Sequence, residues 1–109
     1  MKQFLILYGM PADAMAKMSE MMSKEEMAKG MEEWKAWQEE HKAHIPTPGN
    51  PVGKNTRVNA DGASEQSNEI AGYSVMEGES KEAVLEIVKS CPHFKVPGGY
   101  IDVMELMPM

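Results

Sequence analysis

Histidine is the residue type in this chain best suited to acid–base or metal chemistry, and the chain has three of them. His41 and His44 are spaced so that one helix would present both rings on neighbouring positions, with Glu40 adjacent. A transition metal needs further ligands, and His93 is the remaining candidate of this type. The pair also has a structural explanation, because histidines near a helix end suit the negative end of the helix dipole. We therefore expect no bound metal.

An aromatic wall is the second candidate for chemistry. Trp34, Trp37 and His41 follow one flank of the same predicted helix. Two indoles and one imidazole within about two helical turns suit a small, partly apolar ligand. Tyr73 and His93 are candidates to line the same ligand-binding pocket, and plain core packing is the alternative explanation. Trp34 lies nearer the centre of the apolar stripe, so we expect it to be the more buried tryptophan.

Cys91 and His93 stand on either side of Pro92, which resembles a nucleophile beside a base. The proline points the two side chains apart, and Cys91 belongs to the apolar stripe of its own helix, so we predict a buried, structural cysteine. The methionines number twelve and crowd the first third of the chain. Thioethers bind Cu(I), but without interleaved Cys or His we expect these residues to serve packing, and we expect no cofactor.

Composition narrows the class of protein. The length of 109 residues predicts a single domain, 1–109. The net charge of -6 argues against nucleic-acid binding, which requires clusters of basic residues. No apolar run approaches the length of a membrane span. The apolar stretch after Lys2 is shorter than a signal peptide requires. A single cysteine, Cys91, fits a reducing compartment, so we expect a cytoplasmic protein that binds neither nucleic acid nor membrane.

Apolar periodicity and turn signals divide the chain into alternating strands and helices. Ser23 with Glu26, and Ser80 with Glu82, are typical of helix starts. We predict strands over 2–8, 56–60, 70–76 and 100–107, main helices over 23–43 and 80–91, a short helical insertion over 13–22 and a loop over 47–55. The polar segment 63–69 is predicted to be a mobile loop or an irregular extension of the hairpin.

This order, βαββαβ, predicts an α+β protein. Its four-stranded antiparallel sheet would carry both main helices on one face. The other sheet face would be bare and would need a partner.

Several segments together resemble the YCII-related (DGPF-type) domains: KQFLILY, SKEEMAKGMEEWKAW, the DG turn, GYSVMEGESKEAVLEIVKSCPHF and IDVMELMPM. The resemblance spans nearly the whole chain, with 13–22 and 47–55 the least covered. It implies a ferredoxin-like fold of the dimeric α/β-barrel kind, in which two copies pack sheet against sheet. It also implies a small-molecule cleft between sheet and helices.

The name-giving motif of these domains persists only as Asp61-Gly62, followed by Ala63-Ser64. The catalytic histidine proposed for some members, at the start of the first helix, has no counterpart after Ser23, so no catalytic residue carries over. Two interpretations remain. One is a non-catalytic homodimer that serves as a small-molecule-binding module or as a regulatory module. The alternative is a small lyase, isomerase or dehalogenase-like enzyme with a cleft centred on His41.

Overall fold

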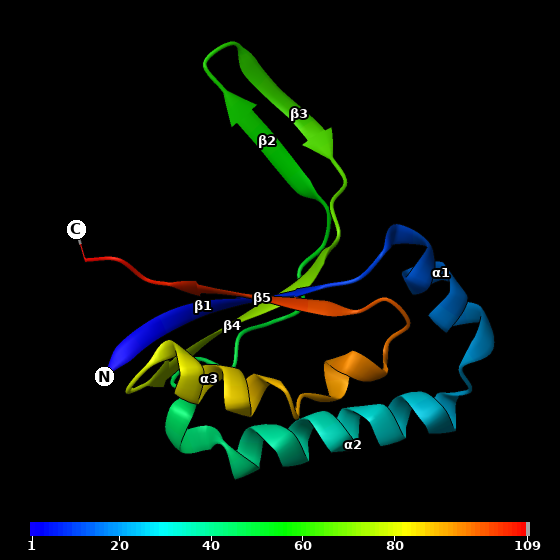
Figure 1. The fold of residues 1–109 in the computed structure, drawn as a ribbon. Coiled ribbons are helices and arrows are strands. Elements are labelled where there is room, and N and C mark those ends of the chain that lie inside the picture. Colours follow the sequence, from blue (N-terminus) through cyan, green and yellow to red (C-terminus); the bar gives the residue numbers. More distant parts are fainter. Residues whose placement is uncertain (109) are drawn as a thin grey trace.

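The computed structural model describes residues 1–108, and the side chains of all of these except Met15, Ser19 and Met21. A sheet carries the main helices on one side, as Figure 1 shows. The strands are β1 (Lys2–Gly9), β2 (Asn55–Asn59), β3 (Gly62–Gln66), β4 (Ile70–Gly78) and β5 (Tyr100–Glu105). The helices are α1 (Ala12–Met21), α2 (Lys24–Glu40) and α3 (Lys81–Val88), with short 3-10 turns η1 (Lys42–His44) and η2 (Pro92–Lys95).

Strand β1 forms the centre of the main sheet, whose strand order is β4-β1-β5 with both neighbours antiparallel. Its consecutive apolar residues divide between the two faces, because successive side chains of a strand point in opposite directions. Phe4, Ile6 and Tyr8 are buried beneath the helices. Leu5 and Leu7 lie on the opposite face and are half-buried. The predicted central position of this strand is therefore confirmed.

The predicted four-stranded sheet is wrong, because the main sheet has three strands and β2 pairs only with β3. The segment Thr47–Val52, which we predicted to be a loop, runs antiparallel along the outer edge of β4 instead. Isolated bridges join Thr47 to Val75 and Pro51 to Gly72. Prolines in this segment cannot donate backbone hydrogen bonds, so it occupies the place of a fourth strand without forming a continuous ladder.

Strands β2 and β3 form a separate hairpin that stands away from the body of the protein (Figure 1). The segment 56–60, predicted as an edge strand of the main sheet, belongs to this hairpin, and the segment 63–69 supplies its second strand. The turn predicted from Asp61-Gly62 is present one residue earlier: Ala60 and Asp61 make it, and Gly62 begins β3. Nearly every residue of the hairpin is exposed, because almost all of its side chains are polar.

The helix starts follow the predicted caps. Ser23 accepts a hydrogen bond from the backbone N–H of Glu26, and Ser80 accepts one from that of Ala83. Both main helices end earlier than predicted, α2 at Glu40 and α3 at Val88, and each is followed by a 3-10 turn. The short helix α1 corresponds to the predicted insertion.

Helices α2 and α3 lie on one side of the main sheet, and α1 lies beyond the end of β1 (Figure 1). Phe4, Ile6, Met76 and Val84 are fully buried between the layers. On the other side, no helix of the described residues covers the sheet, and its apolar side chains are half-buried or exposed. We call this surface the open face, and its apolar residues are Leu5, Leu7, Tyr73, Val75 and Met104, which the strand register places side by side. Within residues 1–108, no helix is long and apolar enough to cross a membrane.

Candidate functional site

The predicted aromatic wall exists as a chain of rings between α2, β1 and η2. The rings of Trp34 and Trp37 have centroids 5.8 Å apart, and those of Trp37 and His41 lie 5.6 Å apart. Tyr8 joins the chain edge-on to Trp34 at 5.1 Å and to His93 at 5.6 Å. We call these rings the aromatic cluster. The structure therefore brings Trp34, Trp37, His41 and His93 together and adds Tyr8.

The order of burial of the two tryptophans is the reverse of the prediction. Trp37 is 5% exposed and belongs to the core, whereas Trp34 is only half-buried. The indole N–H of Trp37 donates a hydrogen bond of 3.0 Å to Ser90 Oγ, just beyond the end of α3. Helix α2 thus turns Trp37 towards α3 and leaves one side of Trp34 accessible.

Polar groups inside the aromatic cluster are tied to partners. His93 Nε2 lies 2.6 Å from the carbonyl oxygen of Gly9, which accepts a hydrogen bond from the ring N–H. The hydroxyl of Tyr8 lies 2.7 Å from Ser74 Oγ. Burial raises the pKa of Tyr8 to about 12, an effect that the bond to Ser74 only partly opposes. Both polar groups therefore have hydrogen-bond partners within the core.

Cys91 is buried, as predicted from its place on the apolar stripe of its helix. Burial raises the pKa of its thiol to about 11, although the backbone N–H of His93 partly stabilises the thiolate. A thiol with this pKa is almost entirely protonated at neutral pH and is a poor nucleophile. The structure therefore agrees with a structural role for Cys91.

Of the predicted site residues, Tyr73 lies apart from the aromatic cluster. Tyr73 pairs with Leu7 and lies on the open face, opposite the aromatic cluster, because Gly72 and Ser74 take the helix-facing positions of β4. His41 caps the C-terminus of α2, with its side chain 21% exposed and 3.9 Å from Glu40. His44 bonds the carbonyl of Glu77. Within residues 1–108, no cluster of three or more His, Cys, Asp or Glu is arranged to hold a metal ion.

A groove of about 540 Å³ opens between α1, α2 and η2, and we call it the α1–α2 groove. This volume lies within the range of small-molecule sites. Its apolar lining consists of Met18, Met22, Trp34, Pro92, Val96 and Pro97. Sequence reasoning assigned the methionines to packing and missed their place here. The signal that points to the groove is the position of Met18 and Met22 on an insertion beside a helix that carries Trp34.

Charged side chains border the α1–α2 groove: Lys17, Glu26, Lys29, Glu33 and Lys95. Lys95 from η2 forms an ion pair with Glu33 from α2, and this hydrogen bond lowers the pKa of the glutamate carboxyl. The pair joins the two elements across one end of the groove. Lys17 is paired with Asp13 on its own helix. The apolar lining is thus bordered by charges that are largely compensated.

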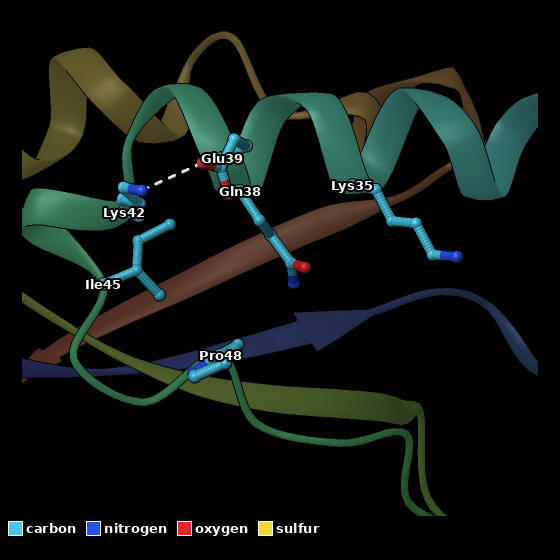
Figure 2. Close-up of a pocket in the computed structure, with 6 residues that line it drawn as sticks. All are labelled: Lys35, Gln38, Glu39, Lys42, Ile45 and Pro48. Carbon is cyan, nitrogen blue, oxygen red and sulfur yellow. Dashed lines mark hydrogen bonds and ion pairs between the residues drawn. The ribbon is translucent and has the colours of Figure 1, made fainter.

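A second cavity of about 390 Å³ lies on the other flank of α2, between the helix and the chain that follows η1 (Figure 2). Its lining is Lys35, Gln38, Glu39, Lys42, Ile45 and Pro48. Lys42 is paired with Glu39 at 3.0 Å, and both side chains are well exposed. No member of the aromatic cluster lines this cavity, and four of its six lining residues are charged or polar, so the α1–α2 groove is the better candidate for a ligand.

No protein-family model matches this chain, and no curated protein matches it. Among solved structures, the chain is similar to 5-chloro-2-hydroxyhydroquinone dehydrochlorinase (TftG) from Burkholderia phenoliruptrix AC1100, in complex with 2,5-dihydroxybenzoquinone. The match covers 98% of this chain and 93% of that chain, with a TM-score of 0.58 and 18% sequence identity. A likeness at this identity shows the fold alone. TftG has the dimeric α+β barrel fold, and the α+β class predicted for this chain is confirmed.

Proposed function

We propose that this chain is a non-catalytic, YCII-related module that forms a homodimer and binds a small molecule in the α1–α2 groove. The observation that carries the proposal is the apolar lining of that groove, with Trp34 half-exposed among methionines and prolines. Indole and thioether groups contact flat apolar molecules well, and methionine adapts to irregular shapes. The expected ligand is a small, largely apolar and preferably aromatic molecule.

The absence of a catalytic role is supported by the state of the nearby titratable groups. His93 is bonded to the carbonyl of Gly9 and Tyr8 to Ser74, so both are occupied within the core. Among the described residues, His41 contributes to neither of the cavities. A general acid or base must lie within hydrogen-bond reach of the bound molecule, and none of these three groups lines the groove. Among the charged side chains that do line it, Glu33 is paired with Lys95 and Lys17 with Asp13.

Tryptophan fluorescence tests binding in the groove. In the Trp37→Phe variant Trp34 is the lone tryptophan, and in Trp34→Phe the lone tryptophan is Trp37. The probes are 2,5-dihydroxybenzoquinone, the ligand of the structural neighbour, and a panel of small aromatic molecules. A bound probe should quench Trp34 saturably and leave Trp37 nearly unchanged. Equal quenching of both, or none across the panel, would speak against the groove.

The homodimer is supported by the open face, where half-buried and exposed apolar side chains of three neighbouring strands lie side by side, next to Asp102. A contiguous apolar surface of this kind marks an interaction site in soluble proteins. Light scattering at micromolar concentration should give twice the chain mass of 12.1 kDa. The variant Val75→Asp, which places a charge on this face beside Leu5, should give the monomer mass.

A second candidate function is a small lyase, isomerase or dehalogenase-like enzyme with a cleft centred on His41. The observation in its favour is the fold shared with a dehydrochlorinase. Incubation of the purified protein with 5-chloro-2-hydroxyhydroquinone separates the two functions, with chloride release as the assay. We expect no release above buffer. Release that His41→Ala abolishes would favour the enzyme over the binding module.

A further inference from the structure

We propose that the β2–β3 hairpin, residues 55–66, is an arm that clasps a second copy of this chain. The inference rests on the homodimer proposed above and adds a second contact to it. The arm pairs only within itself, and all of its residues except Asn55 and Gln66 at its base are exposed. A two-stranded hairpin alone in water is marginally stable, so a hairpin held out from the body gains most from packing on a partner.

The base of the arm is fixed, so its direction is a property of the fold. Asn68 donates a hydrogen bond from its side-chain amide to Asn55 and accepts one from the backbone N–H of Ile70. Glu69 is held by the backbone N–H of Met10 and the hydroxyl of Tyr100. These bonds join the arm to β1, β4 and β5. The hinge between arm and sheet is therefore braced from three strands.

The arm rises on the side of the main sheet opposite to α2 and α3 (Figure 1). This is the side of the open face, which carries Leu5, Leu7 and Val75. A second copy seated on the open face therefore has the arm along its flank. Because a two-fold dimer uses the same surface on both subunits, each copy would receive the other's arm.

The reach of the arm fits this arrangement. Each of its strands has five residues, which corresponds to about 17 Å at the usual rise per residue. Packed sheets are separated by about 10 Å, so an arm that begins at one sheet edge extends beyond the plane of the partner's sheet. Its outer part would contact the border of the partner's sheet and leave the centre of the interface to the open face.

The two faces of the arm differ, and we assign the contact to one of them. Val58 pairs with Ala63, and Thr56 lies on the same face. The opposite face carries Arg57 and Ser64, which pair with each other. Val58 is 74% exposed and is the only large apolar side chain of the arm. The face with Val58, Ala63 and Thr56, which we call the Val58 face, would bury apolar surface if a partner covered it. The polar remainder of the arm suits the rim of an interface.

Sedimentation velocity over a dilution series, carried out on the full chain, tests the arm. The informative variants are Val58→Asp and a chain in which an Asn-Gly turn replaces residues 55–66. Ser64→Asp is the matched control, because it adds the same charge to the opposite face of the same arm. We expect Val58→Asp and the shortened chain to raise the dimer dissociation constant by about tenfold or more, and Ser64→Asp by less than about threefold. Circular dichroism should show that each variant keeps its helices.

The outcomes separate the arm from the dimer itself. A native chain that sediments as a monomer overturns both proposals. A native dimer that Val75→Asp dissociates, but that the shortened chain and Val58→Asp leave within about threefold of native, overturns the arm alone. Equal weakening by Val58→Asp and Ser64→Asp overturns the assignment of the contact to the Val58 face.

Discussion

Replacing each tryptophan by alanine should separate the core from the groove. Trp37 is 5% exposed, packs with Trp34 and His41, and donates a hydrogen bond to Ser90. Removing a buried tryptophan side chain leaves a cavity and costs about 3–5 kcal/mol. Ser90 is exposed and can bond water instead, so the lost hydrogen bond adds only about 1 kcal/mol or less.

Trp34 should behave differently because one side of its ring already faces the α1–α2 groove. Its truncation removes less buried area and opens a space that water enters, so we expect a cost of about 1–2 kcal/mol. For a domain of this size each kcal/mol corresponds to roughly 4–8 °C in melting temperature. Trp37→Ala should therefore melt at least about 10 °C below native, and Trp34→Ala less than Trp37→Ala.

Urea unfolding followed by circular dichroism measures both free energies of unfolding. Protein concentration must be equal in all samples, because the proposed dimer would make apparent stability depend on it. The emission spectrum of each single-tryptophan variant provides an independent check: Trp37 should emit at shorter wavelength than Trp34. A cost for Trp34→Ala equal to or above that for Trp37→Ala would refute the assignment of Trp37 to the core.

Three further predictions concern the buried side chains of Tyr8 and Cys91 and the close contact of Gly49 with the backbone of β4. The pKa of Tyr8 rises to about 12 in the folded chain from about 10 when unfolded. The folded state therefore binds the phenolic proton more tightly, and the free energy of unfolding should fall by roughly 2–3 kcal/mol as pH rises from about 10 to about 12. Urea unfolding of Tyr8→Phe should show no such dependence on pH. Ellman's reagent should label Cys91 only after unfolding, because the thiol is buried with a pKa of about 11, and rapid labelling of the native protein would contradict this. Gly49→Ala should lower the free energy of unfolding by more than about 2 kcal/mol, since a Cβ there would lie 1.7 Å from the carbonyl oxygen of Tyr73 at a φ of +78°. Gly53→Ala is the control, with open space around its Cβ position.

Local signals predicted the parts of the fold that depend on local physics. The caps at Ser23 and Ser80 and the apolar run of β1 were sufficient to locate both main helices and the central strand. The Thr47–Val52 segment could not be recognised, because its prolines and Gly49 are typical of loops and its pairing with β4 is a tertiary contact. Strand β3 has no β-branched or aromatic residue, and its pairing across the Ala60-Asp61 turn determines its structure.

The candidate site was predictable only in part, for a similar reason. Helical spacing placed Trp34, Trp37 and His41 on one flank, and their rings do lie in sequence along α2. Which tryptophan is buried depends on the rotation of α2 against α3, which periodicity does not specify. The position of Tyr73 required the register with β1. The α1–α2 groove required the packing of α1 and η2 against α2, which no local pattern encodes.

The segment Thr47–Val52, along the outer edge of β4, also determines whether another strand can pair with this edge of the sheet. A free strand edge offers alternating N–H and C=O groups, and a second sheet can extend it sideways into a fibre. Here Pro48 and Pro51 occupy that border, and proline has no N–H to offer. Sideways polymerisation is thus prevented on this flank by missing donors. One border of the main sheet is therefore protected against amyloid-like growth.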